Sequence, residues 1–354
     1  MILTVTLNAA LDTTYRLSEL HLHASNRVTV TQQAGGKGVN VARVLAALGH
    51  TATVTGLVGG AAGRAVRADL ARAGLPDELV QVTGETRRTV AVADDRDTTM
   101  LLEPGPEVSP REWQRFLAHY EHLLPGASVA VLSGSLPPGL PIGAYRSLVE
   151  RARSHGVPAV LDADGPALLA ALPARPAVVK PNAAELAAAT GTRNPVEGAE
   201  RLRAAGAEAV VASLGPDGLL ALTAQGCWRA RPAEALAGNP TGAGDSAVAA
   251  LALGLADGAP WPDRLRRAAA LSAATVLAPQ AGRFDPDVYQ HLLNLVRIED
   301  LDPAQPQGEP CRWSEPERSS RPQPEAGSAS ARSTSSSLST PRPSSPVPRP
   351  PGYR

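Results

Sequence analysis

Residues 239–246 read Asn-Pro-Thr-Gly-Ala-Gly-Asp-Ser and lead into an apolar segment, a pattern typical of a loop that feeds a helix N-terminus. Amide groups in the first helical turn lack intrahelical partners and lie at the positive end of the helix dipole, so they can bind an anion. Gly242 and Gly244 would let these amides approach the anion without a Cβ atom in the way. The octapeptide therefore indicates a phosphate site.

Asp245 is the unexpected member of this octapeptide, because a phosphate repels a carboxylate. Its presence suggests a second task, taking a proton from a hydroxyl group that attacks the phosphorus. The alternative is an Asp N-cap on a core helix, with glycines that make the turn. The octapeptide alone favours neither interpretation.

A second glycine-rich stretch, Gly-Gly-Lys-Gly-Val-Asn at residues 35–40, precedes a helical pattern over residues 41–48. Lys37 is followed by glycine rather than by Ser or Thr, so the stretch is not a Walker A motif. A lysine flanked by glycines before a helix can still hold phosphate or sugar oxygens; the alternative is a turn with an exposed lysine. The chain has one other lysine, Lys180, and it also lies in a motif-like stretch.

Polar residues follow four successive predicted strands, at residues 128–132, 158–162, 177–180 and 209–213. Because the carboxyl ends of parallel strands meet at one edge of a sheet, these residues predict a shared crevice. The polar endings are residues 133–135, residues 162–164, residues 180–182 with Glu185, and residues 213–218.

The elements that must position these residues alternate between strand and helix, which is the signature of βαβ units and predicts an α/β fold with a mostly parallel sheet. The segment over residues 243–255 is apolar on nearly every face and should be buried. Further strands are expected at residues 2–7, 51–58, 218–223 and 226–230, and further helices at residues 63–74, 110–124, 143–155, 183–190, 196–205, 264–277 and 286–296.

Residues 89–93 and 98–102 alternate in polarity around Asp94-Asp95-Arg96-Asp97 and predict a β-hairpin. Together with a half-exposed strand at residues 27–33, this hairpin could form a small sheet that acts as a lid. Arg87 and Arg88 precede the hairpin and could reach a phosphate; ordinary surface charge explains them equally well.

Composition excludes several classes of function. The formal net charge of the 354 residues is zero, so the chain shows no electrostatic footprint for nucleic acid or an anionic membrane. Cys227 and Cys311 form neither a metal-ligand spacing nor a disulfide framework, which fits a reducing compartment. Without a basic leader or a long apolar run, a cytoplasmic protein is expected.

From Glu299 onward the composition shifts to Pro, Ser and Arg with few large apolar residues. Such a segment cannot bury enough surface to offset its ordering entropy, so residues 298–354 are expected to form a disordered tail after a domain over residues 1–297. A ligand for a proline-recognition domain is the alternative interpretation of the tail.

Taken together, these residues resemble the ribokinase-like (PfkB-type) carbohydrate kinase family, specifically its phosphosugar branch with 1-phosphofructokinase and tagatose-6-phosphate kinase. The resemblance runs from Met1 to about Val296. Gly-Gly-Lys-Gly alone is unspecific, whereas the octapeptide together with Ser-Gly-Ser-Leu-Pro-Pro-Gly at residues 133–139 and Lys-Pro-Asn at residues 180–182 is specific. The resemblance implies a ribokinase-like fold with helices on both sheet faces and lid strands within about residues 8–33 and 85–103.

The resemblance also implies transfer of a phosphoryl group from ATP, with Mg²⁺, onto a sugar hydroxyl. It assigns Asp245 as the base and Gly242, Ala243 and Gly244 as the anion hole. A dimer formed through the lid strands is implied as well. The remaining implied roles fall to Asp12, Gly36, Lys37, Asn40, Arg87 and Ser135 for the sugar phosphate, Lys180, Ser213, Gly215, Gly218 and Thr241 for the nucleotide, and Asn182 and Glu185 for Mg²⁺ through water.

The preferred interpretation is a kinase that converts fructose 1-phosphate to fructose 1,6-bisphosphate. Tagatose 6-phosphate, fructose 6-phosphate and an unphosphorylated sugar or nucleoside are alternative acceptors, since Thr89 and Leu102 replace asparagines expected near the sugar phosphate. A catalytically silent sensor of sugar phosphate or nucleotide is the alternative of another class; retention of Asp245 argues against it.

Overall fold

The computed structural model describes residues 1–232, 238–278 and 283–301. The chain divides into two units, Met1–Pro310 and Cys311–Arg354, and the described residues all belong to the first. This unit contains a ten-stranded sheet and a four-stranded sheet.

The large sheet has the order β14-β13-β12-β11-β10-β9-β8-β1-β4-β5. Strands from β11 to β5 run parallel, and β12, β13 and β14 are antiparallel additions. This confirms the predicted α/β fold with a mostly parallel sheet. The strands are β1 (Ile2–Thr6), β4 (Ala52–Val58), β5 (Asp77–Gln81), β8 (Val129–Ser133), β9 (Ala159–Asp162), β10 (Val178–Val179), β11 (Val210–Ser213), β12 (Leu219–Leu222), β13 (Cys227–Arg231) and β14 (Arg297–Leu301).

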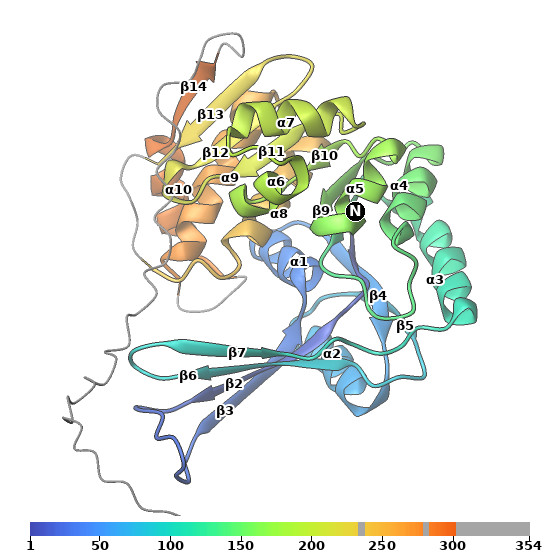
Figure 1. The fold of residues 1–354 in the computed structure, drawn as a ribbon, viewed down its shortest axis with the longest axis vertical. Helices are drawn as coiled ribbons and strands as arrows, with labels where there is room; N and C mark the ends of the chain where they lie inside the picture. The colour runs from blue at the N-terminus through green and yellow to red at the C-terminus, as the bar shows by residue number, and fades with distance from the viewer. Residues whose placement is uncertain (233–237, 279–282, 302–354) are drawn as a thin grey trace, which may run out of the picture. The chain divides into compact units, whose positions relative to one another are not determined.

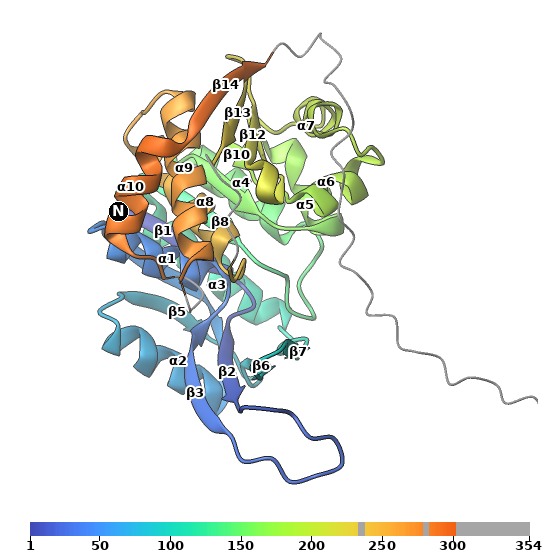
Figure 2. The same ribbon diagram turned by 90° about the vertical axis from the view of Figure 1, so that its left-hand side faces the viewer.

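Helices cover both faces of the large sheet, as Figures 1 and 2 show. Alternate residues of each strand point to opposite faces, so Ile2 and Val54 join one hydrophobic core while Leu3 and Val5 join the other. The first core includes α1 (Lys37–Ala47), α2 (Gly60–Arg72), α8 (Ala243–Ala256), α9 (Trp261–Val276) and α10 (Pro286–Leu295). The second includes α3 (Pro110–Leu123), α4 (Ala144–Ser154), α5 (Gly165–Ala171), α6 (Ala183–Thr190) and α7 (Pro195–Ala204).

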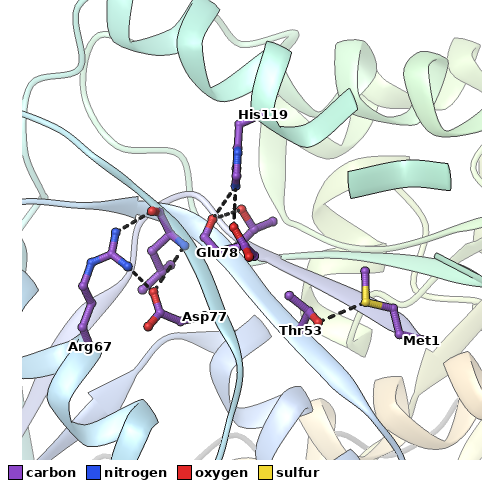
Figure 3. Close-up of polar contacts among 8 residues, drawn as sticks. Met1, Thr53, Arg67, Asp77, Glu78 and His119 are labelled. Atoms are coloured by element: carbon purple, nitrogen blue, oxygen red, sulfur yellow. Dashed lines mark hydrogen bonds and ion pairs between the residues drawn. The ribbon is translucent and has the colours of Figure 1, made fainter. Parts of the chain in front are cut away.

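Strand β5 forms one edge of this sheet, and polar side chains hold it there (Figure 3). Arg67 of α2 forms an ion pair with Asp77 and donates to the carbonyl oxygen of Leu79. Nε2 of His119 in α3 lies 2.9 Å from the carbonyl oxygen of Glu78. The sequence pattern did not predict this strand, because the charged residues that make these contacts interrupt its apolar alternation.

The small sheet has the order β3-β2-β6-β7, and its four strands lie at the lower end of Figure 1. Its strands are β2 (Ala10–Arg16), β3 (Thr29–Gly35), β6 (Arg87–Ala93) and β7 (Thr98–Leu102). The hairpin of β6 and β7 was predicted, and its register pairs Thr89 with Leu102. Strand β2 falls within residues 8–33, where the resemblance implies lid strands, but the residue pattern did not predict its bounds because Asp12, Thr13 and Thr14 follow the apolar run.

Strand β14 corrects the predicted domain boundary. Residues 298–301 were assigned to the tail, but they pair with β13 in antiparallel register, and Ile298 packs against the core. Glu299 lies opposite Arg229 and is exposed, as expected on the outer side of an edge strand. The rest of the predicted tail lies outside the described residues. Within the described ranges, no helix is long and apolar enough to cross a membrane.

Candidate active site

Strands β8, β9, β10 and β11 are neighbours, so their polar carboxyl ends lie along one edge of the sheet as predicted. The N-terminus of α8 adjoins this edge: a Cβ atom on Gly244 would lie 3.4 Å from Nζ of Lys180. Gly242 precedes α8 with a φ of 85°, a left-handed conformation that favours glycine. Helix α9 fastens the turn, because Ser272 donates to the carbonyl oxygen of Ala243 at 2.8 Å.

Asp245 lies in the first turn of α8 and is 7% exposed. The N-cap position belongs to Gly242, and no side chain caps this helix, so the alternative interpretation of Asp245 as an N-cap is wrong. Nδ2 of Asn40 donates to Oδ2 of Asp245 at 2.8 Å. Burial, with the nearby carboxylate of Asp162, raises the pKa of Asp245 to about 7, although Asn40, Lys37 and Lys180 oppose the shift.

Lys37 and Lys180 meet at Asp162, the last residue of β9. Their Nζ atoms lie 3.4 and 3.5 Å from Oδ1 of this carboxylate. The side chain of Lys180 is 5% exposed and that of Lys37 38%. Burial would lower the pKa of Lys37, but Asp162, Glu185 and Asp245 raise it above its ordinary value. Asp162 was predicted only as part of a polar strand ending and had no individual role, because only the fold shows that both lysines reach it.

Asp12 and Gly36 lie where the lid joins α1. Gly36 precedes α1 with a φ of 111°, and a Cβ atom there would lie 2.6 Å from Cγ2 of Thr6. Asp12 pairs with Thr89 in the register of β2 and β6. Burial raises the pKa of Asp12 to about 6 against the opposing effects of Thr89, Arg87 and Arg43.

Arg87 begins β6 and connects the lid to the large sheet. Its Nε donates to the carbonyl oxygen of Asn8 at 3.1 Å. Burial lowers the pKa of Arg87, although Asp12 and Glu103 oppose this. Asn8, which was given no individual role, donates through Nδ2 to Oγ of Ser135 at 3.1 Å and so joins this group to the end of β8.

Asn182 and Glu185 form a capping box at the start of α6. Oδ1 of Asn182 accepts from the amide of Glu185 at 2.9 Å, and Oε2 of Glu185 accepts from the amide of Asn182 at 2.8 Å. Amide and carboxylate oxygens on a rigid turn suit Mg²⁺ held through water, so this pair fits the ion. The described residues contain no cluster of three or more His, Cys, Asp and Glu that would bind a metal directly.

Apart from Lys180, which follows β10, the residues expected on the nucleotide side follow β11 and precede α8. Ser213 forms an isolated parallel bridge with Asn182, which brings these two strand endings together. Gly218 has a φ of 85°, and a Cβ atom there would lie 2.0 Å from the carbonyl oxygen of Ala230, so the hairpin itself requires this glycine. Gly215 and Thr241 lie in exposed turns, and their nucleotide contacts stay a prediction.

Two adjoining cavities, of about 230 and 580 Å³, lie at the opposite, amino end of β9, β10 and β11. Arg153, Arg175 and Arg203 line them beside Glu208. Arg153 and Arg203 occupy the last turns of α4 and α7, where a cation complements the negative end of the helix dipole. The candidate active site is therefore the carboxyl edge, where buried charged groups converge.

Comparison with known proteins gives concordant matches. The family model described as "pfkB family carbohydrate kinase" matches residues 6–287. Phosphofructokinase-2 from Escherichia coli is 30% identical, with a TM-score of 0.78 and coverage of 83% of this chain and 98% of its own. A Thermotoga maritima protein described as a possible 1-phosphofructokinase is 27% identical, with a TM-score of 0.78 and coverage of 85% and 99%.

Proposed function

This chain belongs to the pfkB family of carbohydrate kinases, and on that premise we propose that it transfers the terminal phosphoryl group of ATP to the 6-hydroxyl of fructose 1-phosphate. The product would be fructose 1,6-bisphosphate. A phosphotransferase with an alcohol acceptor follows from the family itself. One observation supports the chemistry above all: a buried carboxylate, Asp245, lies in the first turn of α8 close to two lysines.

In this proposal Asp245 takes the proton of the attacking hydroxyl. Asn40 occupies Oδ2 and keeps the carboxylate oriented, so Oδ1 would be the oxygen that takes the proton. A pKa of about 7 keeps much of the group ionised at neutral pH while making it a stronger base than an exposed aspartate. The proton ends on Asp245 and the phosphoryl group on the sugar oxygen, with ADP leaving.

In this proposal the amides of Gly242, Ala243 and Gly244 form the anion hole for the transferring phosphoryl group, and the Ala243 amide, which donates to the carbonyl oxygen of Pro240 at 3.2 Å, turns to that group when it binds. The ammonium group of Lys180 lies close to Gly244 and adds positive charge to the same place. Ser213, Gly215, Gly218 and Thr241 would border the nucleotide. Asn182 and Glu185 would hold Mg²⁺ through water, and that ion would neutralise negative charge on the phosphates.

Asp12, Gly36, Lys37 and Asn40 would hold the sugar, and Ser135 would border it from the end of β8. Arg87 would bind the substrate's own phosphate. It is half-buried and fixed by Asn8, so its guanidinium loses little entropy when an anion binds. A phosphorylated acceptor therefore fits this site better than a neutral sugar.

Fructose 6-phosphate is the second candidate acceptor, because the similar Escherichia coli protein has been crystallised with fructose 6-phosphate. Tagatose 6-phosphate is a third. The purified protein with ATP, Mg²⁺ and these three ketohexose phosphates should release ADP fastest with fructose 1-phosphate. A higher kcat/KM with another member of the panel would change the acceptor, and ADP release with none would favour the sensor.

We also propose that the lid strands form a homodimer. Val30, Met100, Leu101 and Leu102 are exposed on β3 and β7, the two edge strands of the small sheet. Such a cluster of apolar side chains favours association with another surface. A tetrameric inhibited form of the Escherichia coli protein provides a precedent for association in this family.

A further inference from the structure

Asp162 is the point at which the two lysines of the chain meet. Lys37 begins α1 and Lys180 follows β10, so they come from separate parts of the sequence. Both ammonium groups approach the same oxygen, Oδ1, at 3.4 and 3.5 Å. All other basic side chains, apart from histidines, are arginines. Among the described residues, Asp162 is the one carboxylate within ion-pair distance of either lysine.

The carboxylate of Asp162 is buried and therefore needs cations beside it. Asp162 is 1% exposed, and a buried carboxylate without a cation is strongly unfavourable. Two ammonium groups around one oxygen repel each other, and the carboxylate between them offsets that repulsion. Removing Asp162 would therefore release both lysines at once.

The pairing also affects Asp245. Lys180 lies close to Gly244, at the start of α8, and burial of Asp245 next to Asp162 raises its pKa. Asp245 itself makes no ion pair among the described residues; its hydrogen-bond donor is the neutral amide of Asn40. A lysine bound directly to Asp245 would stabilise the ionised carboxylate and make it a weaker base.

From this geometry we infer that Asp162 is a positioning residue that holds Lys37 and Lys180 as a pair and keeps both ammonium groups out of direct contact with the nearby base Asp245. This inference rests on the proposed function of the same site. In the resting enzyme Asp162 binds both lysines. When substrates bind, Lys180 turns to the transferring phosphoryl group and Lys37 to the sugar phosphate, and neither has to leave Asp245 first.

The lysine content of the chain allows a direct test. Protein labelled with ¹⁵N at lysine side chains has two Nζ signals, one from each residue of the pair. Asp162→Asn should shift both signals in the resting protein and lower kcat roughly 10²-fold, because misplaced groups lose their alignment with the reaction. Asp287→Asn is the matched control, since Asp287 is exposed in the first turn of α10, outside the strand endings of the site, and pairs with neither lysine. It should leave both signals and kcat unchanged.

A second variant covers the case in which Asp162→Asn does not fold. Lys37→Met removes one of the two ammonium groups at Oδ1 of Asp162. The Nζ signal of Lys180 should then shift, because Lys180 no longer shares this oxygen with a second cation. Unchanged lysine signals in the folded variants would overturn the inference. The inference would also be overturned if Asp162→Asn lost activity, if added Mg²⁺ restored that activity, and if both lysine signals stayed in place. The NMR measurement needs no substrate, so failure of the proposed function, seen as no transfer to any sugar phosphate, is distinguishable from failure of this pairing.

Discussion

Asp245 combines two properties that a general base needs: burial that raises its basicity and a neutral hydrogen-bond donor that orients it. Asp245→Asn keeps the shape of the side chain and removes the ability to accept the proton. We expect kcat to fall by roughly 10²-fold or more, with the Kd for the sugar phosphate nearly unchanged. Steady-state kinetics and isothermal titration measure the two quantities. A variant with near-normal kcat would remove Asp245 from the chemistry.

The pKa of about 7 for Asp245 gives this residue a signature in the pH profile. Below that pH the carboxyl group is protonated and cannot accept the hydroxyl proton, so kcat/KM should fall tenfold per pH unit; above it the rate should level off. The profile of the free enzyme, measured between pH 5 and 9, checks the direction. A rate that stays constant down to about pH 5 would contradict a raised pKa at the base.

Arg87 and Arg88 are neighbours with different surroundings and so form a matched pair. Arg87 is half-buried and anchored by Asn8, whereas Arg88 is exposed. If Arg87 binds the substrate phosphate, Arg87→Ala should raise KM for the sugar phosphate about 10- to 100-fold, as expected for loss of a charged hydrogen bond. Arg88→Ala should change KM less than about twofold. Equal effects from both variants would assign Arg87 an ordinary surface role.

At the scale of elements, the sequence predicts the repeated alternation of strands and helices, but not the bounds of individual strands that carry several polar residues. Alternating strands and helices were recognisable because buried parallel strands are apolar runs between turn signals. Strand β2 lies within the range 8–33 implied for the lid, but the residue pattern did not predict its bounds because its polar residues, including Asp12, interrupt the apolar alternation. Strand β5 was missed because Arg67 and His119 hold it by polar contacts. Asp162 shows the limit for a site: its partners lie in two other segments, and only tertiary structure unites them.

The lid is the element whose surface favours a partner. Met100 and Leu101 are adjacent residues of edge strand β7 and point to opposite faces, so replacing both with lysine places charge on each face. If the lid forms a dimer, this variant should sediment as a monomer. Leu169→Lys on α5 changes an exposed leucine outside the lid and should leave the dimer intact. A dimer that survives the lid substitutions would place the interface elsewhere.

At the scale of the whole molecule, β14 changes where the catalytic domain is expected to end. Truncation after Leu301 keeps every described strand, so we expect a free energy of unfolding and a kcat near those of the full chain. Truncation after Val296 also removes β14, uncovers β13 and exposes Ile298's contacts with the core. Loss of that packing should lower the free energy of unfolding by about 2 kcal/mol.

The two truncations separate the edge strand from the rest of the C-terminal segment. Chemical denaturation measures the stability difference, and the kinase assay shows whether the active site depends on either piece. Strand β14 lies at the far end of the sheet order from β1 and β4, so its loss should reduce stability more than kcat. If removal of residues after Leu301 abolished activity, those residues would have to contribute to the active site, and the boundary would lie further along the chain.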